Sequence, residues 1–135
     1  MTHPLLHTQS YINGQWSSAA SGRQYDVVNP ATGQVLATLA DCGQDDASAA
    51  IEAAHAAFAS WKQQTAKARA QILRRWFDLI MQHQDSLAEL MTLECGKPLA
   101  ESKGEVAYGA SFIEWFAEEG KRAYGDAIPT HASDK

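Results

Sequence analysis

The chain has 135 residues, a formal net charge of −5 at pH 7, 45% hydrophobic residues and 20% charged residues. This length is enough for one ordinary domain with its own core, and the content of apolar residues excludes an intrinsically disordered chain. The densest basic spot is the adjacent pair Arg74 and Arg75, so nucleic acid is excluded as an expected partner.

The N-terminus and the cysteines indicate the compartment. Residues 1–10 have neither a long apolar core nor an arginine-rich amphipathic pattern, so no secretion or import signal is predicted. Two cysteines, Cys42 and Cys95, favour free thiols over a disulfide framework. No apolar run approaches the roughly 20 residues that a membrane span needs. We therefore expect a cytoplasmic protein without a membrane partner.

The first part of the chain predicts short β-hairpins. Residues 1–10 are expected to form a loose terminus, and residues 11–41 a β-hairpin region. Asn13-Gly14 lies between apolar residues, which is the strongest short hairpin signal. A second strand pair is expected around Val27 and across the alternating residues 34–39, with a turn at residues 29–33.

Residues 42–123 change to helical periodicity, and about four helices are predicted there. Asp45 and Asp46 suit the positive N-terminal end of the first helix. Its apolar face is expected to include Ile51 and Phe58. Thr65 is expected to cap the second helix by accepting a bond from a free amide.

The third helix is predicted to begin near residues 85–86, where Ser86 and Glu89 have capping-box spacing. It is expected to end at Gly96, the residue type that tolerates the left-handed conformation after a helix. Pro98 fits the first turn of a fourth helix that is expected to run to Lys121.

The fourth helix is predicted to be apolar on two sides. A helix with two apolar sides is normally covered on both, and the other predicted elements can cover only one side. Gly104 and Gly109 favour the close approach of another backbone. We therefore expect a second covering surface from outside these residues. The two stripes are Val106, Ala110, Ile113 and Ala117 on one side, and Tyr108, Phe112 and Trp115 on the other.

No catalytic constellation can be assembled from the sequence. It has no Gly-x-Gly-x-x-Gly, no Gly-Lys-Ser/Thr phosphate loop, no His-Glu-x-x-His and no Cys-x-x-Cys. Cys95 falls at the negative end of a helix, which disfavours a thiolate, so we interpret it as a packed cysteine. The aromatic stripe is interpreted as core rather than a ligand wall. The histidines are interpreted as surface residues: His3, His7, His55, His83 and His131.

Glu94 has an unusual predicted setting. It continues the apolar series Leu87, Leu90 and Met91 of the third helix, so its carboxylate is expected to be buried. A buried carboxylate needs partners. Two interpretations stay open, a structural hydrogen-bonding role and a ligand for a monovalent cation.

Several segments, in this order, resemble the aldehyde dehydrogenase superfamily: residues 11–16, 28–33, 53–58 with Trp61, 92–101 and 112–126. The last two are most similar to succinate-semialdehyde dehydrogenase. Cys95 departs from that branch, which often has an amide residue there. The resemblance implies the N-terminal portion of an α/β fold, mostly α with short N-terminal β-hairpins, and incomplete without its parallel sheet. Residues 42–123 would be the helical part of the dinucleotide-binding domain, and residues 124–135 the start of an oligomerisation hairpin.

The implied function is oxidation of succinate semialdehyde to succinate, with NAD or NADP in the intact parent enzyme. The family's catalytic and cofactor residues would follow residue 135, so the chain alone is expected to be inactive and to bind no cofactor. Its expected partners are the remainder of the parent enzyme, which would be a homo-oligomer.

Two site assignments follow from the resemblance. Glu94 would lie by a monovalent-cation site together with backbone near Val27, and Tyr108 would approach the substrate-entry channel. The alternative function is a non-catalytic helical interaction module that self-associates or binds a related full-length subunit.

Overall fold

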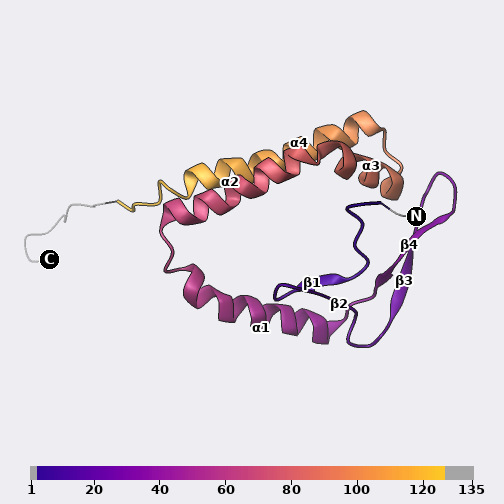
Figure 1. Ribbon diagram of the computed structural model, residues 1–135, viewed down its shortest axis with the longest axis horizontal. Helices are drawn as coiled ribbons and strands as arrows, with labels where there is room; N and C mark the ends of the chain where they lie inside the picture. The colour runs from indigo at the N-terminus through magenta and orange to yellow at the C-terminus, as the bar shows by residue number, and fades with distance from the viewer. Residues whose placement is uncertain (1–2, 127–135) are drawn as a thin grey trace, which may run out of the picture.

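The computed structural model describes residues 3–126, which form two β-hairpins followed by four helices (Figure 1). The strands are β1 (Ser10–Ile12), β2 (Gln15–Ser17), β3 (Gln24–Val28) and β4 (Val35–Ala40). The helices are α1 (Gln44–Trp61), α2 (Ala66–Gln82), α3 (Gln84–Cys95) and α4 (Leu99–Glu119). The predicted fold class, mostly α with short N-terminal hairpins, is confirmed.

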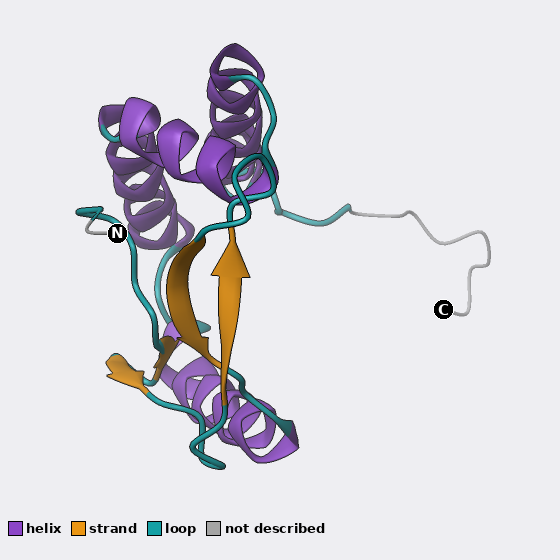
Figure 2. Cartoon of the chain, turned by 90° about the vertical axis from the view of Figure 1, so that its right-hand side faces the viewer, coloured by secondary structure: helices purple, strands orange, loops and turns teal. Residues whose placement is uncertain are grey.

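The elements form two separate layers. Helices α2, α3 and α4 pack together, whereas α1 lies apart from them beside β1 and β2 (Figure 1). The longer strands β3 and β4 span the distance between the α1 side and the helical layer (Figure 2). The described residues contain two-stranded antiparallel sheets and no parallel sheet.

The first hairpin follows its local sequence. Asn13 and Gly14 both have positive φ, 51° and 79°, as the two central residues of a type I′ turn require. The register pairs Tyr11 with Trp16. His7 stacks on Trp16 with ring centroids 3.9 Å apart, so the residues before β1 are tied to the hairpin.

The second hairpin closes around Asn29. Its side-chain oxygen accepts a 2.8 Å bond from the Ala31 amide, and its backbone oxygen accepts one of the same length from the Gly33 amide. These bonds satisfy the turn locally. The pairing of β3 with β4 is irregular between Val27 and Val28.

Asp46 anchors the start of α1. Its two carboxylate oxygens accept backbone bonds from Gly43, at 2.8 Å, and from Ala20, at 2.9 Å. These bonds, that of Gly43 foremost, hold the pKa of Asp46 below its ordinary value. Beyond this anchor α1 is solvated, and Ile51 and Phe58 are 69% and 56% exposed. The predicted apolar face of α1 is therefore uncovered within the described residues, because α2–α4 do not pack on it.

The ends of α2 and α3 test the predicted caps. Thr65 Oγ1 accepts a 3.2 Å bond from the Ala68 amide, which confirms its cap. The predicted Ser86–Glu89 capping box is wrong, because α3 begins at Gln84 after the single non-helical residue His83. Ser86 therefore lies inside the first turn instead of before it.

The boundaries of α4 differ slightly from the prediction. Gly96 ends α3 with φ 75°, as predicted. Pro98 stands immediately before α4, as its N-cap, and not in its first turn. The helix ends at Glu119 instead of Lys121.

The core lies between α2, α3 and α4 and is built from small side chains. A hydroxyl pair, Thr92 Oγ1 and Ser102 Oγ at 2.8 Å, joins α3 to α4 within it. Ser102 is completely buried, so this bond satisfies a group that water cannot reach. Small residues let the helix axes approach closely. The buried apolar residues of these helices are Ala70, Ala88, Val106, Ala110 and Ala117.

The two predicted stripes of α4 have different environments. Val106, Ala110 and Ala117 are buried against the other helices, whereas the opposite stripe is open. A Cβ added at Gly104 or Gly109 would meet no atom of the described residues within 4 Å. Close packing within this part of the chain therefore does not explain these two glycines.

Candidate functional site

The exposed stripe of α4 is the first candidate surface. We call Tyr108, Phe112 and Trp115 the aromatic face; their exposed fractions are 67%, 48% and 63%. The interpretation of these residues as core is thus wrong for residues 3–126. The Tyr108 and Phe112 rings meet edge to face, with centroids 4.9 Å apart, an arrangement that aromatic quadrupoles favour.

An open cavity of about 770 Å³ lies beside this face. Its apolar lining comes from α4, and its charged lining comes from α2, from α4 and from Arg122, which follows α4. Tyr108 is not among the lining residues, so the predicted channel residue and this cavity lie near each other along α4 without Tyr108 lining the cavity. The lining consists of Arg74, Ser111, Phe112, Glu114, Trp115, Phe116, Glu118, Glu119 and Arg122.

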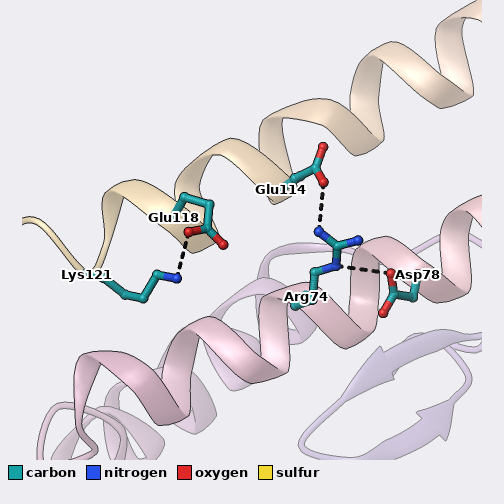
Figure 3. Close-up of polar contacts among 5 residues, drawn as sticks. All are labelled: Arg74, Asp78, Glu114, Glu118 and Lys121. Carbon is teal, nitrogen blue, oxygen red and sulfur yellow. Dashed lines mark hydrogen bonds and ion pairs between the residues drawn. The ribbon is translucent and has the colours of Figure 1, made fainter.

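The charges at this cavity are paired. Figure 3 shows Arg74 of α2 between Asp78 of the same helix, at 3.2 Å, and Glu114 of α4, at 2.8 Å. Lys121 Nζ lies 2.6 Å from Glu118 Oε2, and its hydrogen bond is the main reason that the pKa of Glu118 is lowered. With both signs compensated, the cavity offers no concentrated field for a free anion or cation.

Sequence reasoning missed the bond between Arg74 and Glu114. The two residues are 40 positions apart, and each belongs to a different helix. Within α2, the spacing of Arg74 and Asp78 indicates an i, i+4 pair. No comparable signal in the sequence links Arg74 to α4.

Glu94 and Val27 are the predicted cation residues. Glu94 is exposed at the C-terminal end of α3, so the expected burial is wrong, and Val27 is half-buried. Their elements meet where Gly96 touches the β3–β4 turn: a Cβ at Gly96 would lie 2.9 Å from Pro30 Cγ. Within residues 3–126, no group of three or more His, Cys, Asp or Glu residues could hold a metal ion.

Cys95 is not packed as predicted. It is exposed, and its thiol donates a 2.9 Å bond to the Met91 carbonyl of its own helix. Lys97 nearby pairs with Glu105, whose hydrogen bond raises the pKa of the lysine. Cys42 is also a free, exposed thiol. Neither cysteine is paired with a base in the arrangement that nucleophilic catalysis requires.

The histidines are dispersed. His7, His55 and His83 are exposed and His3 is half-buried, while His131 lies outside the described residues.

Across the part of the chain that the structure describes, no helix combines the length and hydropathy needed to cross a membrane. The expected oligomerisation hairpin at residues 124–135 lies almost entirely outside the described residues.

Comparison with known proteins defines the class. A profile of the aldehyde dehydrogenase family matches residues 16–135, which is most of the chain. The arrangement of hairpins and helices is likewise found at the N-terminal end of aldehyde dehydrogenase chains. The chain belongs to the aldehyde dehydrogenase family.

Within the family, the similar relatives include semialdehyde dehydrogenases. The NADP(+) succinate-semialdehyde dehydrogenase GabD of Escherichia coli (strain K12) is 59% identical over 131 residues, covering 97% of this chain and 27% of the relative. The glutarate-semialdehyde dehydrogenase of Pseudomonas putida is 56% identical with the same two coverages. The crystal structure of succinate-semialdehyde dehydrogenase from Burkholderia pseudomallei has a TM-score of 0.93 and 55% identity, covering 98% of this chain and 28% of that chain. The chain thus spans little more than a quarter of these relatives.

Proposed function

We propose that this chain is the N-terminal part of an NAD(P)-dependent aldehyde dehydrogenase that oxidises succinate semialdehyde to succinate. The observation that carries the proposal is the 59% identity to the Escherichia coli enzyme across 97% of the chain. The uncovered aromatic face supports the proposal, because an exposed apolar patch of this kind usually packs against another part of the protein or a partner. The remainder of the parent enzyme is that partner, and the parent is a cytoplasmic homo-oligomer.

The role of this part is structural support and not chemistry. The sequence has no glycine-rich phosphate loop, and neither cysteine is paired with a base within residues 3–126, so we assign no step of the reaction and no cofactor contact to these residues. In the parent, NAD or NADP would supply the hydride acceptor for this oxidation. The 135-residue chain alone is therefore inactive.

Two local assignments belong to this proposal. Glu94 and the Val27 backbone contribute to a monovalent-cation site in the parent. The nearness of the α3 end to the β3–β4 turn supports this assignment, since a Cβ at Gly96 would lie 2.9 Å from Pro30 Cγ. Tyr108 faces the route by which the aldehyde enters. Residues 42–123 belong to the dinucleotide-binding domain.

The test of the function is an assay of the parent enzyme, made from the reading frame that extends beyond codon 135. We expect NAD(P)H formation with succinate semialdehyde, at a higher kcat/KM than with glutarate semialdehyde. The purified 135-residue chain is the matched control and should form none. A parent without aldehyde-dependent activity, or a stop codon directly after codon 135, would favour the non-catalytic interaction module.

The cation assignment has its own test. Glu94→Gln in the parent should reduce the dependence of thermal stability on sodium or potassium, with Glu89→Gln, an exposed acid of the same helix, as the control. An unchanged salt dependence in Glu94→Gln would exclude the carboxylate from the site.

A further inference from the structure

We propose that Asn13 is a site of spontaneous deamidation, and that its isoaspartate product holds the β1–β2 hairpin open. The reaction needs an asparagine side chain and the backbone N–H of the next residue. The sequence has two asparagines, Asn13 before Gly14 and Asn29 before Pro30. Proline has no backbone N–H, and Asn29 Oδ1 accepts a 2.8 Å bond from the Ala31 amide. Asn13 is therefore the reactive one of the two.

The chemistry needs only water besides Asn13 and Gly14. The Gly14 nitrogen attacks Asn13 Cγ, so that an N–Cγ bond forms and the Cγ–Nδ2 bond breaks. The Gly14 amide proton leaves with Nδ2 as ammonia, and a five-membered imide ring remains. Water then opens this ring at one of its two carbonyl carbons. Cleavage of the N–Cγ bond gives aspartate, whereas cleavage at the backbone carbonyl carbon gives isoaspartate, whose main chain runs through Cγ.

Both reacting groups are open to solvent. Asn13 and Gly14 are exposed, and a Cβ added at Gly14 would meet no atom of the described residues within 4 Å. Gly14 also has no side chain of its own that would hinder the approach of Cγ to its nitrogen. Within residues 3–126, no hydrogen bond holds the Asn13 side chain or the Gly14 amide. The turn thus presents an unhindered nitrogen next to a free carboxamide.

The turn conformation limits the rate of the reaction. Asn13 and Gly14 have φ of 51° and 79° in the type I′ turn. Ring closure brings the Gly14 nitrogen beside Asn13 Cβ by rotation about the Cα–C bond, and the left-handed conformation keeps these two atoms apart. The reaction therefore proceeds from molecules whose hairpin has opened. Each strand has three residues and β1 pairs with β2 alone, so the hairpin is marginally stable and the open form is populated.

The two products differ in their main chain. Aspartate keeps the ordinary backbone and tolerates the left-handed conformation as asparagine does, so the turn can form again. Isoaspartate adds a methylene to the main chain between positions 13 and 14, and a two-residue loop of that length no longer matches the strands. The register that pairs Tyr11 with Trp16 is then lost. The stack of His7 on Trp16, with ring centroids 3.9 Å apart, is lost with it.

Opening of the hairpin also affects α1. A cavity of about 340 Å³ lies between the turn and this helix, lined by Asn13 and Gly14 on the hairpin side and by alanines such as Ala53 and Ala57 on the α1 side. Since α1 lies apart from α2–α4 (Figure 1), the hairpin is its neighbour on this side. An isoaspartate at position 13 should therefore leave α1 more solvated.

Peptide mapping of the 135-residue chain tests the site. Arg23 is the first basic residue and Lys62 the second, so trypsin places Asn13 in the first peptide and Asn29 in the second. After incubation of the folded chain at mildly alkaline pH, the first peptide should gain the mass difference between an amide and a carboxyl group. An isoaspartyl methyltransferase should methylate part of it, and the second peptide should not change. A sample digested without incubation is the blank.

An unchanged first peptide, or equal conversion of the two peptides, would overturn the proposal. Incubation in urea should make the conversion of Asn13 several-fold faster, because every molecule is then open. Equal rates in buffer and in urea would mean that the hairpin is already open, which would overturn the structural consequence assigned to isoaspartate.

The structural consequence has a matched control in Asn13→Asp, which has the charge of the converted chain without the additional methylene. The His7 ring protons report the stack in NMR spectra, because the ring current of Trp16 shifts them. This shift should persist in Asn13→Asp and be lost in the isoaspartate fraction of the incubated chain. A shift retained in both would overturn the proposal. None of these measurements depends on the proposed function.

Discussion

Asp46 shows how one carboxylate can connect two segments of the chain. It accepts backbone bonds from Gly43, which precedes α1, and from Ala20, between β2 and β3. Since these bonds lower its pKa in the folded state, its contribution to stability is complete above the ordinary carboxyl pKa, near 4. It is lost as the pH falls through the lowered native value.

We expect Asp46→Asn to destabilise the chain at neutral pH and to reduce the loss of stability on acidification. An amide has one acceptor oxygen and cannot accept both bonds as a carboxylate does. Urea unfolding followed by circular dichroism between pH 3 and 7 measures the effect, with Asp45→Asn as the control. Equal pH profiles for the two variants would show that the two hydrogen bonds of Asp46 do not contribute to the pH dependence of stability.

Gly96 combines two constraints at one residue. Its φ of 75° disfavours a side chain, and a Cβ there would lie 2.9 Å from Pro30 Cγ. Gly33 has a similar φ of 72° with nothing within 4 Å. Gly33→Ala should therefore lower the free energy of unfolding only by the strain of a positive φ, about 1–2 kcal/mol. Gly96→Ala should lower it further, because the added Cβ also meets Pro30.

Adding Pro30→Ala should recover the excess cost of Gly96→Ala, because it removes the contacting ring carbon. Denaturant unfolding of the single and double variants gives the coupling energy. Equal costs at the two glycines, with no recovery from Pro30→Ala, would mean that the β3–β4 turn moves away freely.

At the scale of elements, α3 and α4 are joined by the hydroxyl pair of Thr92 and Ser102. Ser102→Ala leaves the Thr92 hydroxyl without this partner inside the helical layer and should cost about 1–3 kcal/mol. Thr92→Val with Ser102→Ala removes both polar groups at nearly constant shape and should be less destabilising than the sum of the single changes. Strict additivity in denaturant unfolding would contradict a direct bond between the hydroxyls.

Short sequence signals correctly predicted those turns and helix ends that depend on bonds between neighbouring residues. The Asn13-Gly14 turn, the Thr65 cap and the left-handed Gly96 each depend on a few neighbouring residues. Ser86 failed as a cap because one residue, His83, separates α2 from α3. The sequence pattern shows where a helix begins only when the break before it is long enough to be recognised.

Burial could not be predicted as well. Glu94, Ile51 and the aromatic face lie at positions where periodicity predicts a core, yet they are exposed. Periodicity identifies which face needs cover, and it does not say whether the covering surface belongs to the same stretch of chain. The bond of Arg74 to Glu114 was unpredictable for a related reason, since it depends on how two helices dock.

For the whole molecule, the central observation is the separation of α1 from α2–α4 (Figure 1). Small residues dominate the core, while large ones such as Trp76, Phe116 and Trp115 remain 55%, 59% and 63% exposed. A protein of this composition ordinarily buries most of its large apolar side chains. This distribution supports the proposal that the chain is part of a longer enzyme whose other residues cover these side chains.

A chimera tests this account most directly. Residues 1–135 would replace the corresponding N-terminal part of the Escherichia coli succinate-semialdehyde dehydrogenase, to which the chain is 59% identical. If this chain is the beginning of such an enzyme, the chimera should form NADPH from succinate semialdehyde at a kcat within about tenfold of the unmodified enzyme, a loss of less than about 1.4 kcal/mol. A folded, soluble chimera with no aldehyde-dependent NADPH formation would contradict the account.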